Sequence, residues 1–284
     1  MGALYAVDVD KLMKQYRLST MAMKKHSVTT TTCVICGETA YFLQSVNNHR
    51  IFHCGKCGLE FCNPMPSNRE REMFYQNYFD VRARRSVVKL NAQKNLDFLI
   101  RYYHLNKNIY LLDFGCGHNF FVKACHLRGI TGSYGFDPYF APTRPVYMLP
   151  WELCRERTWD CITLWGVLEH LSNPVATMST LRSLLCDEAL IVLTTVCTHT
   201  EIPYNHKPPE HTLYFTKKSL ELLAKTVKLS LVEFRTYTMW QDSDVYLSIL
   251  LRRVPKNVQA KITHNLDKYI EVPTNEIVAI FKKQ

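Results

Sequence analysis

Residues 111–117 read LLDFGCG, and this stretch decides the fold. The apolar residues that lead up to Asp113 are typical of a short buried strand. Gly115 and Gly117 follow, and FFVKACHLRG at 120–129 has helical character. The two glycines let the backbone approach a ligand closely, and the first turn of the helix presents free N–H groups there. The pattern predicts a strand, a nucleotide-binding turn and a helix.

A second strand, SYGFD, ends in Asp137 about twenty residues further on. A carboxylate at that point can accept hydrogen bonds from both hydroxyls of an adenosine ribose. A dinucleotide fingerprint would need a third glycine where Phe120 stands, and the Walker phosphate-binding pattern does not occur in the sequence. Asp113, two places before Gly115, would repel a pyrophosphate but suits the ammonium group of an amino-acid ligand.

Four of the eleven cysteines form two C-x2-C pairs that are separated by seventeen residues: Cys33, Cys36, Cys54 and Cys57. A glycine follows each pair and allows the tight turn that points two sulfurs at one ion. The spacing predicts a closed four-sulfur zinc site that stabilises residues 33–62 and takes no part in catalysis. Two disulfides are the alternative, which the absence of a secretion signal disfavours. Alternating residues in YFLQSV, RIFHC and LEF predict the short strands of a zinc ribbon.

Several segments, in this order, resemble the class I S-adenosylmethionine-dependent methyltransferases, specifically the group with an N-terminal zinc ribbon (types 11, 12 and 23). The resemblance covers residues 33–235. The similar segments are CGLEFCNPMPS (57–67), LLDFGCG (111–117), GFD (135–137), WDCITLWGVLEHLSNP (159–174), ALIVLTT (189–195) and HTLYFTKKSLELLAK (211–225). It implies an α/β fold with a Rossmann-like, mainly parallel sheet, an antiparallel edge hairpin and a small zinc ribbon in front.

The resemblance also implies which residues bind S-adenosylmethionine. Asp113, Gly115 and Gly117 are expected to bind the methionine part of the cofactor. Asp137 is expected to bind the ribose, and Leu164 and Trp165 are expected to border the methyl group. The chain departs from the family pattern in two places. Only 22 residues separate Asp137 from Asp160, so the helix usual there is expected to be very short. The segment LLCDEALIVL lacks the glycine that commonly turns the chain before the fifth strand.

His170 and His211 are the candidate catalytic residues, because both follow strands whose carboxyl ends bind substrate in this fold. Methyl transfer needs alignment in a dry pocket, and a base only where the acceptor loses a proton. Related small-RNA and ubiquinone-pathway O-methyltransferases have a Glu-x-x-Glu-His run that, with a later His, binds a divalent ion. Gly166 replaces the first Glu here, which weakens such a site. A base, a metal site with Glu169 and a structural role therefore all stay open.

The sequence suggests five successive parts, which are a tail (1–32, with a TTTT linker), the zinc ribbon (33–66), a helical bridge (67–105), the cofactor-binding core (106–254) and a second tail (255–284). In the bridge, the aromatic residues at 74–79 are expected to pack between ribbon and core. The segments 229–238 and 245–253 are expected to finish the sheet as an antiparallel pair. In the second tail, residues 256–270 suggest a weak amphipathic helix.

The net charge is +10, with the basic excess on the flanks and a balanced middle. This pattern suits an anionic substrate, although a merely solvated basic surface fits as well, since no block of five like charges occurs. The apolar runs are too short for a membrane span and no leader is evident, which predicts a cytoplasmic protein without a membrane partner.

The expected activity is methyl transfer from S-adenosylmethionine to an oxygen, nitrogen or carbon atom of an unidentified acceptor. Ribbon-bearing relatives favour a small-molecule or glycan acceptor over nucleic acid, while the basic flanks keep RNA open as a partner. The alternative is a non-catalytic zinc-ribbon module that binds RNA or protein and carries a vestigial cofactor pocket.

Overall fold

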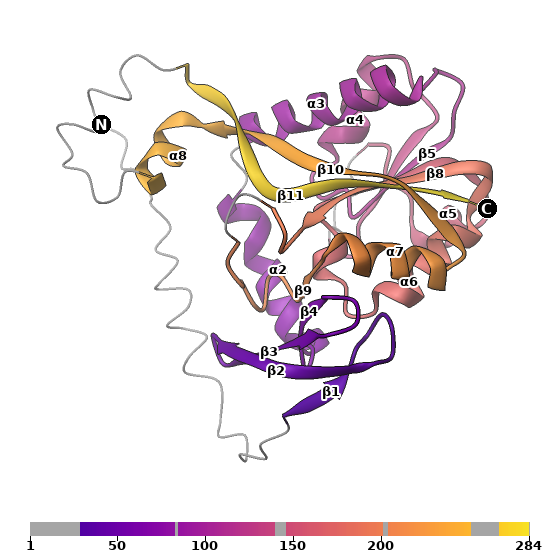
Figure 1. Cartoon of the computed structure of the whole chain (residues 1–284). Helices are drawn as coiled ribbons and strands as arrows, with labels where there is room; N and C mark the ends of the chain where they lie inside the picture. The colour runs from indigo at the N-terminus through magenta and orange to yellow at the C-terminus, as the bar shows by residue number, and fades with distance from the viewer. Residues whose placement is uncertain (1–28, 83–84, 140–145, 201–203, 251–266, 284) are drawn as a thin grey trace.

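The computed structural model describes residues 29–82, 85–139, 146–200, 204–250 and 267–283. These residues form two sheets, a larger one that carries most of the helices and a smaller one built largely from the N-terminal part (Figure 1). Helix α2 (Asn68–Arg82) leads from the smaller sheet to the larger one. In the part of the chain that the structure describes, no helix combines the length and the apolar character needed to cross a bilayer.

The larger sheet has the strand order β10-β11-β8-β7-β5-β6. Four strands run parallel, namely β5 (Leu111–Phe114), β6 (Ser133–Phe136), β7 (Trp159–Trp165) and β8 (Leu185–Val196). Next to β8, β11 (Tyr269–Lys283) is antiparallel, and β10 (Leu229–Asp242) pairs antiparallel with β11 at the edge. The predicted fold class, a mainly parallel Rossmann-like sheet with an antiparallel edge pair, is confirmed.

Helices cover both faces of this sheet (Figure 1). On one face lie α3 (Arg85–Tyr103) and α4 (Phe120–Leu127). On the other lie α5 (Trp151–Arg155), α6 (Pro174–Ser183) and α7 (Lys217–Thr226). Successive residues of each strand alternate between the two resulting cores; for example, Leu111 packs with α3 and α4, and Leu112 packs in the opposite layer. Burial on both faces explains the continuous apolar runs in these strands.

The smaller sheet has the order β1-β2-β3-β4-β9. Its strands are β1 (Thr30–Thr32), β2 (Thr39–Val46), β3 (His49–Cys54), β4 (Glu60–Cys62) and β9 (Leu213–Tyr214). The three strands predicted for the ribbon are present. The TTTT run is not a linker, because Thr30–Thr32 pair with Thr39–Tyr41. The fifth strand comes from the segment after β8, so the core completes the ribbon sheet.

The C-terminal strand prediction was wrong in its second member. Residues 245–250 belong to helix α8 (Ser243–Leu250), which begins where the Asp242 carboxylate accepts the backbone N–H of Val245. The partner of β10 is β11, from the segment that was expected to be a tail. Its run Ile277–Phe281 is almost entirely buried, as is typical of a central strand. Most of the helix suggested at 256–270 lies outside the described residues.

Both departures from the family pattern have a structural outcome. Between β6 and β7, the only described helix is the five-residue α5, as expected. At the start of β8, Glu188 adopts a left-handed backbone conformation with φ 61°. This residue supplies the turn for which relatives commonly use glycine, in a region that glycine enters most easily.

Candidate active site

The turn between β5 and α4 is built around left-handed backbone positions. Gly115 has φ 79°, Gly117 has φ 49° and Asn119 has φ 61°. A Cβ atom on Gly115 would lie 2.6 Å from Cγ2 of Val167, in the loop after β7. Both its conformation and its surroundings therefore exclude a side chain at this position. The turn brings backbone N–H groups to the carboxyl edge of the sheet.

Asp137, at the end of β6, closes this turn. Its Oδ2 accepts the backbone N–H of Gly117 at 3.0 Å, and its Oδ1 accepts that of Tyr139 at 2.9 Å. These bonds fix the carboxylate beside the turn and half-buried. Sequence reasoning placed Asp137 and Gly117 in one site, and the structure brings them into direct contact.

Asp113 is buried in β5 directly beside Thr163 of β7, whose hydroxyl donates a hydrogen bond of 2.8 Å to Asp113 Oδ1. Burial raises the pKa of Asp113 to about 7, against the opposing effect of the Thr163 hydrogen bond, and the nearby Asp137 adds to the rise. A cation placed next to this carboxyl group would therefore stabilise its ionised form.

The side chains of Leu164 and Trp165 lie on opposite faces of the sheet. Leu164 is completely buried in the core beneath α6 and α7. Trp165 is half-buried on the other face, the one that also holds Asp113, and packs edge-on against Phe121 of α4. Its indole Nε1 is buried without a hydrogen-bond partner in the described part of the chain. An unsatisfied buried donor destabilises a protein by about 1–3 kcal/mol.

The residues around the turn fit S-adenosylmethionine. Asn119 is completely buried, and its Oδ1 also lacks a hydrogen-bond partner among the described residues, while its Nδ2 donates to the carbonyl of Val146. Buried polar groups of native proteins are normally paired, so these unpaired atoms are suited to a bound ligand. A buried carboxyl group and a carboxylate at the next strand end match an amino-acid nucleoside better than a polyphosphate.

His170 and His211 lie together on the same edge of the sheet. His170 ends the short helix η1 (Leu168–His170) after β7, and His211 precedes β9. Their ring centroids are 4.9 Å apart. Together with Glu169 they offer ligand atoms within 4.8 Å of one another, an arrangement that could hold a divalent cation. The structure therefore brings the two candidate histidines into one cluster.

Backbone contacts fix this cluster. The Nδ1 of His170 lies 2.5 Å from the carbonyl oxygen of Glu210, and the carbonyl oxygen of Glu169 accepts the N–H of Thr212 at 2.9 Å. The Glu169 carboxyl group is buried and accepts a hydrogen bond from Thr195 at 2.9 Å. Burial raises the pKa of Glu169 to about 7.

Three further residues at this site were not among the predicted ones. Glu210 places its carboxylate 4.0 Å from His211 Nε2, and its position next to His211 was the available signal. In β11, desolvation raises the pKa of the half-buried Glu276 to about 8, and the nearby Glu169 carboxyl adds to this. The Tyr75 ring stacks on Tyr139 at 4.5 Å and lies edge-on to His170, so one bridge aromatic reaches the site.

The four cysteines of the ribbon form a second cluster. Sγ of Cys33 lies 3.6 Å from that of Cys57, Sγ of Cys36 lies 3.5 Å from that of Cys54, and all four sulfurs are within 4.8 Å of one another. A disulfide needs about 2.05 Å, whereas sulfurs on a zinc tetrahedron with bonds of about 2.3 Å lie about 3.8 Å apart. The geometry suits a tetrahedral metal site, and zinc remains the predicted ion.

The chain is similar to one known protein family and to several solved structures. A family model described as a methyltransferase domain matches residues 83–233. No curated protein matches the chain. The similar solved structures include the Synechocystis PCC 6803 magnesium protoporphyrin IX methyltransferase with bound SAH (12% identity, 78% of this chain, 90% of that chain, TM-score 0.43). Another is the plantazolicin methyltransferase BpumL in complex with SAH and a pentazolic desmethylPZN analogue (13% identity, 77% of this chain, 92% of that chain, TM-score 0.44).

A third is the complex between the Haloferax volcanii Trm112 methyltransferase activator and its methyltransferase partner, with 12% identity, 75% of this chain and 97% of that chain aligned, and a TM-score of 0.49. The family match spans more than half of the chain and includes the turn that carries Asp113, Gly115 and Gly117. This chain belongs to the methyltransferase-domain family.

Proposed function

We propose that this chain is an S-adenosylmethionine-dependent methyltransferase that methylates an oxygen, nitrogen or carbon atom of a small acceptor such as a sugar or metabolite. The observation that carries the proposal is the closed turn, in which the Gly117 N–H and the Asp137 carboxylate meet beside the buried Asp113. The match to the methyltransferase-domain family supports it.

The cofactor-binding roles follow from the charge and position of each group. Asp113 would hold the α-ammonium group of the cofactor, because a cation compensates its buried carboxylate. Gly115 and Gly117 would give the methionine part access to the backbone, and Asp137 would accept hydrogen bonds from the ribose hydroxyls. Trp165 would border the methyl group and supply its unpaired indole N–H. Leu164, which was expected beside the methyl group as well, is completely buried on the opposite face of the sheet and would not contact the ligand. When bound, S-adenosylmethionine supplies an electrophilic methyl group on a sulfonium centre.

His170 would accept the proton that an acceptor loses. The Glu210 carbonyl can only accept a hydrogen bond, so Nδ1 of His170 must carry a proton and donate it. In the neutral ring this leaves the lone pair on Nε2, as a general base requires. His211, beside His170 and near the Glu210 carboxylate, would orient the acceptor or share the proton.

We also propose that the cysteine cluster binds one structural Zn²⁺ ion through Cys33, Cys36, Cys54 and Cys57. The four sulfurs would fill a tetrahedral coordination sphere and leave no position for a substrate. This role matches the place of the four cysteines in the fold, since they belong to the ribbon, whereas the two histidines lie at the edge of the larger sheet.

Calorimetric titration tests the proposed function without knowledge of the acceptor. We expect zinc-assayed, folded protein to bind S-adenosylmethionine and, separately, S-adenosylhomocysteine with a dissociation constant in the micromolar range, because the turn offers both charge and backbone contacts. ATP and NAD serve as controls that share the adenosine but lack the amino-acid part. Binding of neither ligand would favour the non-catalytic ribbon module and end this proposal.

A further inference from the structure

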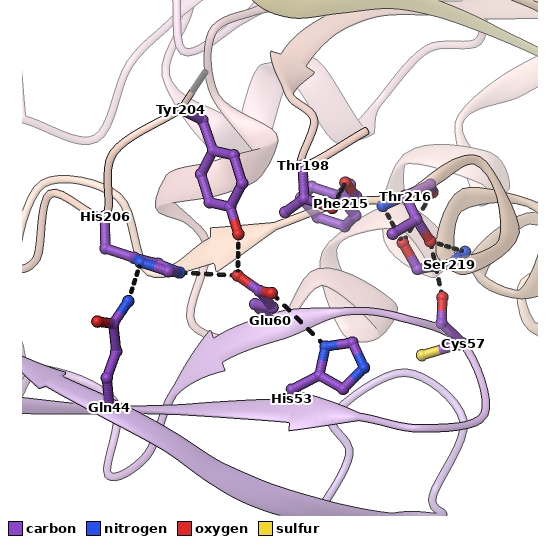
Figure 2. Close-up of polar contacts among 10 residues, drawn as sticks. All are labelled: Gln44, His53, Cys57, Glu60, Thr198, Tyr204, His206, Phe215, Thr216 and Ser219. Carbon is purple, nitrogen blue, oxygen red and sulfur yellow. Dashed lines mark hydrogen bonds and ion pairs between the residues drawn. The ribbon is translucent and has the colours of Figure 1, made fainter. Parts of the chain in front are cut away.

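The ribbon contacts the segment after β8 through a polar network that the zinc prediction does not require (Figure 2). Glu60 lies in β4, three residues after Cys57, and its side chain is about 11% exposed. Its Oε2 accepts hydrogen bonds from Tyr204 Oη at 2.5 Å and from His206 Nε2 at 2.8 Å. His53 Nδ1 lies 3.6 Å from Oε1. Two of these three partners come from the segment after β8, far from the ribbon in sequence.

The groups around Glu60 are arranged to favour a carboxylate. Burial alone would raise the pKa of Glu60, but the hydrogen bonds from His206 and Tyr204 outweigh it and hold the pKa below its usual value. On the far side of His206, the amide nitrogen of Gln44 donates to Nδ1 at 2.8 Å. Nε2 of a neutral His206 therefore carries the proton that it donates to Glu60. A chain of oriented hydrogen bonds thus runs from β2 to β4 through a residue of the core.

Residues 204–216, which we call the His211 loop, are attached to the ribbon at further points. Near the start, Asn47 donates to the carbonyl of Pro208 at 3.3 Å. Near the end, the backbone N–H of Cys62 donates to the carbonyl of Thr212 at 2.9 Å, and the Thr216 hydroxyl donates to the carbonyl of the cluster residue Cys57 at 2.7 Å. The ribbon therefore contacts the loop on both sides of His211.

The same loop is attached to the core at its middle. The N–H of Thr212 donates to the Glu169 carbonyl, and the Glu210 carbonyl lies against Nδ1 of His170. Inside the loop, Tyr214 Oη donates to the carbonyl of His211 at 3.0 Å. The position of His211 relative to His170 therefore depends on these core contacts together with the points at which the ribbon holds the loop.

We propose that Glu60 is a positioning residue of the active site, because its contacts with Tyr204 and His206 hold the His211 loop against His170. This inference rests on the proposed function, since it concerns the histidine pair of that site. Glu60 does not touch the reacting atoms; it acts through the loop. The zinc ribbon is then a part of the catalytic architecture as well as a separately stabilised module.

The test uses the full chain, loaded with zinc, and compares Glu60→Gln with wild type. Glutamine keeps the size of the side chain and one acceptor oxygen but removes the charge that the donors of Tyr204 and His206 face. We expect amide hydrogen exchange within 206–214 to become about tenfold faster or more, because charge-assisted hydrogen bonds of the loop are weakened. The ring signals of His170 and His211 in ¹H–¹⁵N spectra should shift, a change that a loss of general stability would not produce. Zinc content and affinity for S-adenosylhomocysteine should stay within twofold of wild type.

Glu38→Gln is the matched control, because Glu38 is an exposed ribbon carboxylate whose partner is Lys56 at 2.6 Å. It should leave the loop unchanged. Tyr204→Phe removes a hydrogen bond of the same network from the loop side and leaves the ribbon residues unchanged. It should also make amide hydrogen exchange in 206–214 faster. Unchanged exchange and ring signals in both network variants, with normal S-adenosylhomocysteine binding, would overturn the positioning role alone. Absence of that binding in wild type would instead overturn the proposed function.

Discussion

Asp113→Ala is expected to weaken binding of S-adenosylmethionine and S-adenosylhomocysteine by about 100-fold or more, because removal of one partner of a buried charge pair is strongly unfavourable. Far-UV circular dichroism should stay unchanged, since the hydrogen bond of the Asp113 carboxyl group is with another side chain, Thr163, and the backbone pairing of the sheet is left intact. Calorimetric titration of both ligands measures the effect. Retained micromolar binding would show that the ammonium site lies elsewhere.

Asp113→Asn sharpens this test because it should weaken ligand binding and at the same time stabilise the ligand-free protein above neutral pH. The pKa of Asp113 is about 7 in the folded protein and about 3.9 in an unfolded chain. The stability associated with this group is therefore fully present below pH 4 and is lost as the pH rises through 7. Asparagine cannot ionise, so the ligand-free variant should melt at a higher temperature than wild type at pH 8. A variant that neither binds ligand nor melts higher would indicate misfolding.

The pH dependence of S-adenosylhomocysteine affinity should follow from the same carboxyl group. Affinity is expected to rise as Asp113 ionises through about pH 7. It should fall again at higher pH, as the α-amino group of the ligand loses its proton. In Asp113→Asn the weak remaining affinity should lose both limbs, because both depend on the pair of carboxylate and ammonium group, while Asp137→Asn serves as a control carboxylate with a different role. If the affinity of Asp113→Asn still rises with pH, the rise belongs to another group. Glu169 is the candidate, because its pKa is also raised to about 7.

The parts of this protein that could be predicted from sequence are those whose geometry depends on neighbouring residues. Gly115 and Gly117 predict their turn because glycine enters the left-handed backbone region easily and lets the backbone approach its neighbours closely. The cysteine pairs predict their cluster because the spacing C-x2-C places two sulfurs on one side of a tetrahedral site. In both cases, spacing along the chain and geometry in space are nearly the same information.

The C-terminal strand pair shows where local patterns fail. Ser243–Leu250 is as apolar as a strand, but the Asp242 side chain caps a helix there. Conversely, the run Ile277–Phe281 has the composition of a central strand, and nothing near it in sequence shows that it lies between β8 and β10. Strand order is decided by which faces can be buried together, a property of the whole sheet.

The ribbon–loop network could not be predicted for a related reason. Glu60 and His206 are 146 residues apart. Glu60 lies in the segment 57–67 that resembles the family, but His206 lies in none of the similar segments. The β4–β9 pairing that brings them together involves a strand of only two residues, Leu213–Tyr214, whose composition gives no pairing partner. The sequence therefore predicts the two sites of the molecule, but not the contacts that connect them.

Cys54→Ser is expected to abolish stoichiometric zinc binding, because a serine hydroxyl replaces one of four thiolate ligands in a closed site. Metal binding and folding are coupled in such modules, so the ribbon sheet should lose its order together with the ion. A loss of about 4 kcal/mol would lower the melting temperature by about 10 °C in a chain of this size. Zinc content by metal analysis and melting by calorimetry are measured on the same sample.

Cys62→Ala is the matched control. Cys62 is a buried cysteine in β4 of the same sheet, and it lies outside the four-sulfur cluster. Its replacement should destabilise the ribbon only by the loss of one buried sulfur and leave one zinc per chain. A Cys54→Ser protein that is as stable as wild type without metal would contradict the structural role of the ion.

Because Thr216 of the His211 loop donates to the carbonyl of Cys57, hydrogen exchange in 206–214 should rise in Cys54→Ser and stay low in Cys62→Ala. The ribbon and the loop would then prove to be one cooperative unit, in which a metal site stabilises residues that contact the substrate edge of the sheet.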